Sequence, residues 1–312
     1  MIKYGASDMR CSRKSSIGAT LSLFVLLFSL SEPALGENDL SLETARAAAE
    51  KGDAKAQYFL GKCYAKGREV QQDYTKAAAY LLEAAEQGHA YAQNDLGVLY
   101  AKGLGVKQDY AEAAKWYRKA AEQGDALAQY STGRAYAEGR GVPKDVPESL
   151  KWYQKAAEQE QTDALLALGT IYLNGEEGIK QDYHEAFSYF QKAAGQGRYD
   201  AFNSLGYLYE HGLGVDQRPE KAVKCYREAA ERCDGRAQMN LGRMYLDGSG
   251  VERDLIESYK WFILARENGE LTVQKYLRDF ETSDVLKPEE MAEANGRADK
   301  FREKVRKTKP KD

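Results

Sequence analysis

The amino-acid sequence predicts an all-α protein built from helix-turn-helix repeats that stack into a solenoid. A Leu-Gly dipeptide, Thr-Gly in one copy, recurs at intervals of 36, 36, 36, 37 and 36 residues along the 312-residue chain. The ending Ala-Ala-Glu-Gln-Gly at 120–124 recurs with substitutions at 48–52, 84–88, 156–160, 193–197, 229–233 and 265–269. A fixed period of roughly 20–50 residues over several copies is typical of solenoids. Helix-forming Ala, Glu, Lys, Leu and Gln also dominate, and runs of β-branched residues are missing, which favours helices over strands.

The period divides the chain into a half-repeat, six full repeats and a C-terminal segment. Residues 37–52 predict one helix with the ending of a second repeat helix. The full repeats span 53–88, 89–124, 125–160, 161–197, 198–233 and 234–269. Residues 270–312 leave the period and predict two closing helices, 271–280 and 287–304, which cover the last apolar face. For the basic tail, 302–312, we expect a solvated, frayed end rather than a contact with an anionic surface.

The first 36 residues have the plan of a secretory signal peptide. Four basic residues precede an uncharged apolar run at 17–30, and Ala34 and Gly36 supply the small residues of a cleavage site after Gly36. As a helix this run spans about 21 Å, less than the roughly 30 Å of a membrane's hydrocarbon core. The sequence therefore predicts a cleaved signal, a periplasmic or secreted protein, and no stable membrane insertion after cleavage.

Each predicted repeat has a glycine in the middle of its first helix, which spans about residues 54–66 in the first repeat. Glycine inside a helix costs about 1 kcal/mol relative to alanine, so its recurrence predicts a close crossing of two helices. The second helices carry aromatic pairs such as Trp116-Tyr117, which at helical spacing indicate an interhelical core. The six glycines are Gly61, Gly97, Gly133, Gly169, Gly206 and Gly242.

The second helix of most repeats begins after an aspartate that is placed to cap it. In four of the five cases a glutamate follows three residues later, as in Asp109 and Glu112, which is the spacing of a capping box. In the fifth repeat Arg218 takes the aspartate's place, and Pro219 follows as the first helical residue. We therefore interpret these acids as helix caps and not as catalytic carboxylates. They are Asp73, Asp109, Asp145, Asp182 and Asp254.

The repeat resembles the Sel1-like repeat family, which is related to tetratricopeptide repeats. The resemblance covers about 230 of the 312 residues. It implies a right-handed superhelix of helix pairs that serves as a scaffold or adaptor for other proteins, with the first helices on a concave side. The residues that carry it in the second repeat are Ala92-Gln93, Leu96-Gly97, Tyr100, Gly103, Gly105-Val106, Asp109, Ala113, Trp116-Tyr117 and 120–124.

A comparison of the repeats with one another predicts where a partner binds, because packing residues should recur and binding residues should differ. Three variable columns on the first helix lie four residues apart and so form one stripe. If the first helices line a concave side, this stripe is its floor, where Tyr, Arg and Asn suit recognition of a partner. The predicted partner-binding residues are Tyr58, Lys62, Asn94, Tyr130, Arg134, Asn203, Tyr207, His211 and Arg243.

Cysteines and histidines give little support for catalysis. A cysteine-rich subgroup of the family has one disulfide per repeat between cysteines eight residues apart, and β-lactamase activity is ascribed to it. Cys225 and Cys233 have that spacing only once and out of phase with the subgroup. We expect Cys63 and Cys225 to be small buried residues and Cys233 to be partly exposed. The three histidines show no metal-ligand spacing.

The sequence as a whole predicts an exported scaffold that binds a protein or peptide and uses no cofactor, metal or catalysis. The formal net charge of −3, which becomes more negative without residues 1–36, argues against general nucleic-acid binding. Two alternatives stay open. One is a hydrolase of β-lactam or cell-wall amides, as ascribed to the cysteine-rich relatives, and the other is a secreted effector that binds a host protein.

Overall fold

The computed structural model describes residues 41–283 and 285–308, and every regular element within these ranges is helical. The all-α prediction is therefore confirmed. None of the helices in these ranges is both long and apolar enough to span a membrane. The predicted signal peptide at 1–36 and the last four residues of the basic tail lie outside the described residues.

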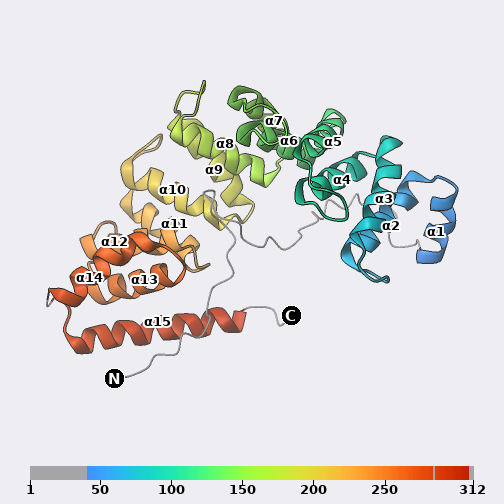
Figure 1. The fold of residues 1–312 in the computed structure, drawn as a ribbon. Coiled ribbons are helices and arrows are strands. Elements are labelled where there is room, and N and C mark those ends of the chain that lie inside the picture. Colours follow the sequence, from blue (N-terminus) through green and yellow to red (C-terminus); the bar gives the residue numbers. More distant parts are fainter. Residues whose placement is uncertain (1–40, 284, 309–312) are drawn as a thin grey trace. The chain divides into compact units, whose positions relative to one another are not determined.

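Most of the helices have the same length, and they alternate between first and second helices of a repeat (Figure 1). They are α1 (Leu42–Glu50), α2 (Ala54–Lys66), α3 (Tyr74–Glu86), α4 (Ala90–Lys102), α5 (Tyr110–Glu122), α6 (Ala126–Glu138), α7 (Val146–Glu158), α8 (Thr162–Asn174), α9 (Tyr183–Gly195), α10 (Tyr199–His211), α11 (Pro219–Ala230), α12 (Gly235–Asp247), α13 (Leu255–Glu267), the 3₁₀ helix η2 (Leu271–Val273), α14 (Gln274–Thr282) and α15 (Pro288–Thr308).

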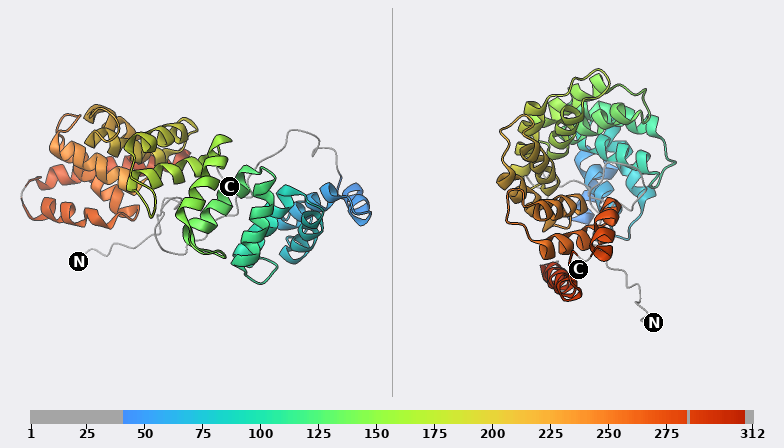
Figure 2. Two further views of the ribbon diagram at one scale, coloured as in Figure 1. Left: turned by 90° about the horizontal axis from the view of Figure 1, so that it is seen from above. Right: turned by 90° about the vertical axis from the view of Figure 1, so that its left-hand side faces the viewer.

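The chain divides into two compact units, whose described parts are an N-terminal unit of residues 41–181 and a C-terminal unit of residues 182–283 and 285–308. In the N-terminal unit each helix from α1 to α8 packs against the next one along the chain. In the C-terminal unit α9 to α13 follow the same order, and both α14 and α15 then pack on α13. Figure 2 shows this consecutive order within each unit from two further directions. The boundary falls between α8 and α9, inside the repeat predicted at 161–197.

The two helices of a repeat approach each other most closely at the central glycine of the first helix. A Cβ atom built on Gly97 would lie 2.8 Å from the ring of Tyr117, and one on Gly206 would lie 2.6 Å from the ring of Tyr226. Real Cβ atoms essentially never come within 3.0 Å of another heavy atom, so the second helix occupies the space of the missing side chain. Gly61, Gly133 and Gly242 have the same environment, against Leu81, Tyr153 and Phe262, and Gly169 is buried in α8.

The aspartates before the second helices accept hydrogen bonds from backbone N–H groups of the first helical turn. Asp109 accepts from Ala111 and Glu112, and Asp73, Asp145, Asp182 and Asp254 accept in the same way. The glutamate half of the predicted capping box is not formed. The backbone N–H of Asp109 donates instead to the carbonyl of Tyr100 at 3.0 Å, and Glu112 forms an ion pair with Lys115. The capping-box interpretation was therefore only half right, because another partner already satisfies the N–H group that the glutamate would cap.

Buried amide side chains join three consecutive helices, a feature that the sequence analysis did not identify. The Nε2 atom of Gln93 on α4 donates to the carbonyl of Ala85 on α3 at 3.0 Å, and its Oε1 accepts from Gln123 after α5 at 2.7 Å. Both groups of the buried amide are thereby satisfied, so that its burial carries no unpaired-group penalty. Equivalent pairs are Gln57 with Gln87, Gln129 with Gln159 and Gln238 with Asn268. We call these pairs the amide ladder.

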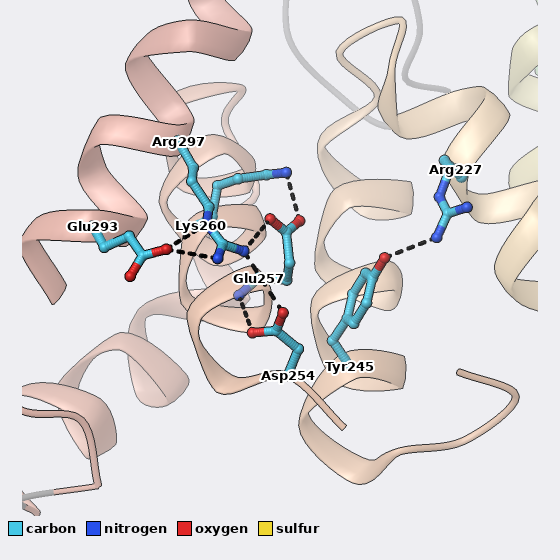
Figure 3. Close-up of polar contacts among 7 residues, drawn as sticks. All are labelled: Arg227, Tyr245, Asp254, Glu257, Lys260, Glu293 and Arg297. Carbon is cyan, nitrogen blue, oxygen red and sulfur yellow. Dashed lines mark hydrogen bonds and ion pairs between the residues drawn. The ribbon is translucent and has the colours of Figure 1, made fainter. Parts of the chain in front are cut away.

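The closing helix α15 is held on α13 by ion pairs and apolar contacts. Figure 3 shows Arg297 on α15 between Glu257 of α13 and Glu293 of its own helix, at N···O distances of 2.7 Å to each. Lys260 pairs with the other oxygen of Glu257 at 2.6 Å. Nearby, the buried Ala294 and Ala298 and an edge-on contact between Phe301 and Trp261 supply the apolar part.

The expected frayed tail from residue 302 is partly wrong, since α15 continues through Thr308. Arg302 forms an ion pair with Glu267 at 2.6 Å, and Lys304 lies 3.8 Å from Glu231. Carboxylates on the last two repeats therefore neutralise part of the basic tail and favour its helical continuation.

We expect replacement of Gly97 by alanine to destabilise the protein by about 1 kcal/mol, because overpacking against Tyr117 outweighs the gain in helix propensity. Gly296 in α15 is a matched control, since an added Cβ atom there meets nothing within 4 Å. Gly296→Ala should stabilise the protein by about 0.5–1 kcal/mol. Urea unfolding measures both effects, and equal stabilisation by the two substitutions would contradict the close crossing.

Candidate partner-binding surface

The predicted partner-binding stripe lies on first helices in both units. In the N-terminal unit it comprises residues of α2, α4 and α6, and in the C-terminal unit residues of α10 and α12. The neighbouring column stays apolar and is buried in every repeat, which separates packing from solvent-facing positions. That column is Cys63, Leu99, Ala135, Ile171, Leu208 and Met244.

Two of the predicted residues are buried and contribute mainly to packing. Tyr58 is 8% exposed, and its ring stacks on His89 with the ring centroids 4.6 Å apart. Asn94 is 7% exposed. Tyr130 is half-buried, with its ring centroid 5.7 Å from that of Tyr153. The surface that these three residues offer to a partner is therefore smaller than the sequence pattern suggests, because His89 and Tyr153 contact the two tyrosine rings and Asn94 is itself buried.

In the C-terminal unit the stripe exposes an aromatic pair. Tyr207 on α10 is 43% exposed, and His211 lies one turn later with its ring edge-on at a centroid distance of 4.5 Å. Arg243 is engaged within the stack. Its guanidinium pairs with Glu210, which also accepts a hydrogen bond from the hydroxyl of Tyr226 at 2.6 Å. Tyr207 and His211 are therefore the residues of this unit's stripe that are most available to a partner.

Asn203, the remaining predicted residue of α10, takes part in a contact between first helices. Its Oδ1 accepts a hydrogen bond from Nδ2 of Asn240 on α12 at 3.1 Å. The side chain is half-buried. This bond links neighbouring repeats beside the aromatic pair and limits the freedom of Asn203 to bind a partner.

In the N-terminal unit the stripe carries cations without carboxylate partners. They are Lys62 on α2 and Arg134 on α6, together with Lys66 on α2 and Lys102 on α4 from the variable column that holds His211 in the fifth repeat. We call these four residues the cationic stripe. Within the described part of the chain, no carboxylate oxygen lies within 4.0 Å of any of these four side chains. Burial lowers the pKa of Lys102, and the neighbouring Arg134 lowers it further. Positive charge is therefore concentrated on this surface.

The cations on the second helices of the same unit have carboxylate or indole partners. Lys115 on α5 pairs with Glu112 and Lys151 on α7 pairs with Glu148, at N···O distances of 2.5 and 2.8 Å. The remaining cations are paired in the same manner or lie over an indole ring: Lys76 with Asp73, Arg118 with Glu122, Lys119 over Trp116 and Lys155 over Trp152. Four of these six second-helix cations thus pair with a carboxylate, whereas none of the four cations of the cationic stripe does among the residues that the structure describes.

Asp95, next to the cationic stripe on α4, is a buried carboxyl that the sequence analysis missed. It is 7% exposed, and burial raises its pKa to about 7, although Lys62 opposes the shift. Nδ2 of Asn94 lies 3.5 Å from its Oδ1, and Oδ1 of Asn94 is buried with no hydrogen-bond partner. The signal in the sequence was a charged residue in a column otherwise occupied by Phe59, Ser131, Ala167, Ser204 and Asn240.

The cysteines and potential metal ligands add no chemistry to this surface. Cys63 is buried, and Cys225, expected to be buried, is only half-buried, as is Cys233. Burial raises the pKa of the Cys225 thiol to about 11, which keeps it protonated and unreactive at neutral pH. Among residues 41–283 and 285–308 no group of three or more His, Cys, Asp or Glu side chains is arranged to hold a metal ion.

We expect Asp95→Asn to remove a pH dependence of stability. The folded carboxyl holds its proton up to about pH 7, whereas the unfolded one loses it near 3.8, so the wild type loses stability as the pH rises between these values. The asparagine variant lacks this loss. Urea unfolding measures the free energy of unfolding of both proteins at about pH 4.5 and about pH 8. The difference, variant minus wild type, should be larger at the higher pH by more than about 1 kcal/mol. An equal difference at both pH values would contradict the burial of an ionisable group here.

Comparisons with known proteins agree with the repeat architecture. The family model described as Sel1 repeat matches residues 54–89, 90–125, 126–160, 162–197, 203–232 and 235–270. No curated protein matches the chain. The solved structures that are similar to it include two at more than 30% sequence identity.

One of these structures is a protective antigen of uropathogenic Escherichia coli with an SLR fold, at 37% identity and a TM-score of 0.73 over 84% of this chain. The chain spans only 56% of that protein's length. The other is a Sel1 repeat protein from Oxalobacter formigenes, at 33% identity and a TM-score of 0.68, with 82% of this chain and 98% of that one covered. Because the family model matches more than half of the chain and two relatives share its fold over most of its length, the protein belongs to the Sel1 repeat family.

Proposed function

We propose that the protein is an exported scaffold without catalytic activity that binds a protein or peptide partner through the stripe on its first helices. Sel1 repeat proteins are commonly protein-interaction scaffolds, which supports the coarse part of this proposal. The finer part rests on the stripe itself. The hydrolase alternative gains no support from the described residues.

The exposed pair of Tyr207 and His211 is the observation that carries the proposal. Leu205 and Leu208 on the same helix are buried in the stack, whereas Tyr207 leaves almost half of its surface in solvent. The edge-on contact with His211 restricts the ring, so that little rotamer entropy is lost when a partner covers it. Exposed tyrosines of this kind are enriched among the residues that dominate binding energy at protein interfaces.

Export is the part of the proposal that rests on the sequence of residues 1–36. If the signal is cleaved after Gly36, the mature chain begins at Glu37. N-terminal sequencing of the protein purified from the envelope and the medium of producing cells measures this directly. We expect Glu37 as the first residue, and an N-terminus that retains the apolar run would contradict cleavage.

Binding is tested by crosslinking capture from the native source with residues 37–312 as bait. We expect Tyr207→Ala/His211→Ala to reduce capture of the partner by at least roughly tenfold, because the aromatic pair supplies contact area without supporting the fold. Tyr110→Ala is the matched control, since Tyr110 is 39% exposed but lies on the second helix α5. It should capture as the wild type does.

All three proteins should melt at similar temperatures, which shows that any loss of capture is not a loss of folding. Equal capture by the three proteins would contradict a site at the aromatic pair. Loss of capture by the Tyr110→Ala variant alone would place the binding surface on the second helices.

A further inference from the structure

The cationic stripe of the N-terminal unit indicates the chemistry of the partner. We propose that this stripe binds an acidic protein segment, a stretch of chain whose Asp and Glu side chains pair with Lys62, Lys66, Lys102 and Arg134. This inference rests on the proposed scaffold function and adds the chemical class of the ligand.

The four cations lie on three successive first helices of the unit, Lys62 and Lys66 one turn apart on α2, Lys102 on α4 and Arg134 on α6. Lys62 and Lys66 on α2 both act on the carboxyl of Asp95 on α4, and Arg134 on α6 acts on Lys102 of α4. Their charges thus reach across three successive first helices. Holding like charges near one another without ion-pair partners is unfavourable, and a bound carboxylate relieves that repulsion.

Aromatic rings from the same helices hold two of the cations in place. The Nζ atom of Lys62 lies 5.3 Å from the ring centroid of Tyr58, and the guanidinium carbon of Arg134 lies 5.8 Å from that of Tyr130. Cation–π contacts of this length orient a cation while leaving its N–H donors available. The buried or half-buried tyrosines of the stripe therefore contribute to binding indirectly, by positioning the charges above them.

Asp95 does not neutralise the stripe. Its carboxyl is buried beside Asn94, forms no ion pair with a lysine, and is about half protonated near neutral pH. Second-helix lysines of the same unit, by contrast, are neutralised, because Glu112 on α5 pairs with Lys115 and Glu148 on α7 pairs with Lys151. On α6 Glu138 follows Arg134 by one turn, but its carboxylate pairs with Arg140 at 2.8 Å and not with Arg134. Among residues 41–283 and 285–308 the stripe's cations therefore form no ion pair of their own, and an external carboxylate is the complementary partner.

An acidic protein segment fits this surface better than a nucleic acid does. The chain as a whole carries a formal net charge of −3, which opposes the long-range attraction of a polyphosphate backbone. The rings on which bases would stack, Tyr58 and Tyr130, are buried or half-buried. Carboxylate groups need only the charge and the N–H donors that the four cations present.

The test uses a fluorescent peptide of alternating Glu and Ser, about ten residues long, and its Gln-Ser counterpart as the neutral probe. Fluorescence anisotropy with residues 37–312 measures binding. We expect the Glu-Ser peptide to bind, the Gln-Ser peptide to bind at least roughly tenfold more weakly, and the affinity for the Glu-Ser peptide to fall as salt is added. A wild-type protein that binds neither peptide, or both equally, overturns the inference.

Charge-reversal variants locate the site. Lys102→Glu/Arg134→Glu should weaken binding of the Glu-Ser peptide by at least roughly tenfold, whereas the control Lys115→Glu/Lys151→Glu should stay within about twofold of the wild type. Both variants change the net charge equally, so a general electrostatic effect would weaken both alike and overturn the inference. Should the reversed variant fail to fold, Lys102→Gln/Arg134→Gln removes the two charges without adding repulsion and should show the same loss.

An oligothymidylate of equal charge serves as the competing ligand, and its tighter binding to the cationic stripe would replace the acidic segment with a nucleic acid and overturn the inference.

Failure of this inference can be distinguished from failure of the proposed function. If neither peptide binds but capture of the native partner still depends on Tyr207 and His211, the scaffold function stands and the acidic ligand is wrong. If Glu-Ser binding succeeds but capture does not depend on that pair, the cationic stripe remains a site and the aromatic pair is wrong.

Discussion

The close approach of a first-helix glycine to a side chain of the second helix is the constraint on which each repeat depends. Because the ring of Tyr117 fills the space where Gly97 lacks a side chain, the two helices pack at backbone distance over one turn. Successive residues of a helix are rotated by about 100°, so fixing the glycine against the second helix also fixes which neighbouring columns are buried. The apolar column from Cys63 to Met244 then packs, and the stripe on the other side of the glycine is left for solvent and partners.

Polar groups divide between stacking and recognition according to their place in the repeat. The caps and the amide ladder satisfy polar groups at helix ends and in the buried layer, as Gln93 does between Ala85 and Gln123. Leu165 and Phe202 take the place of the ladder glutamine in the fourth and fifth repeats, so apolar packing replaces the hydrogen bonds there. Four of the six cations on α3, α5 and α7 pair with carboxylates, whereas the four cations of the cationic stripe on α2, α4 and α6 do not within the described ranges. Charges that form no ion pair within the stack remain available to an acidic ligand.

Features that recur in each repeat could be predicted from the sequence, and features that depend on one repeat's neighbours could not. The glycines and cap aspartates form columns, and comparison of six copies identifies them without a structure. The amide ladder was visible in the same way, as Gln57, Gln93, Gln129 and Gln238 in an otherwise buried column, but its two partners lie 8 and 30 residues away and could not be paired by inspection. The burial of Tyr58 under His89 depends on a contact from the next repeat. Arg297 belongs to no column, so its contact with Glu257 had no signal at all.

A double-mutant cycle between Gly97 and Tyr117 tests the central constraint most directly. The free energy of unfolding is measured for the wild type, Gly97→Ala, Tyr117→Ala and the double variant. If the ring occupies the space of the missing side chain, the alanine at position 97 costs much less once the ring is removed, since the nearest atom outside the ring, the carbonyl oxygen of Ala113, lies 3.1 Å from its Cβ atom. The coupling free energy between the two substitutions is then about 1 kcal/mol or more. Additive effects, with a coupling near zero, would show that the glycine recurs for a reason other than the close crossing and would contradict this account of the fold.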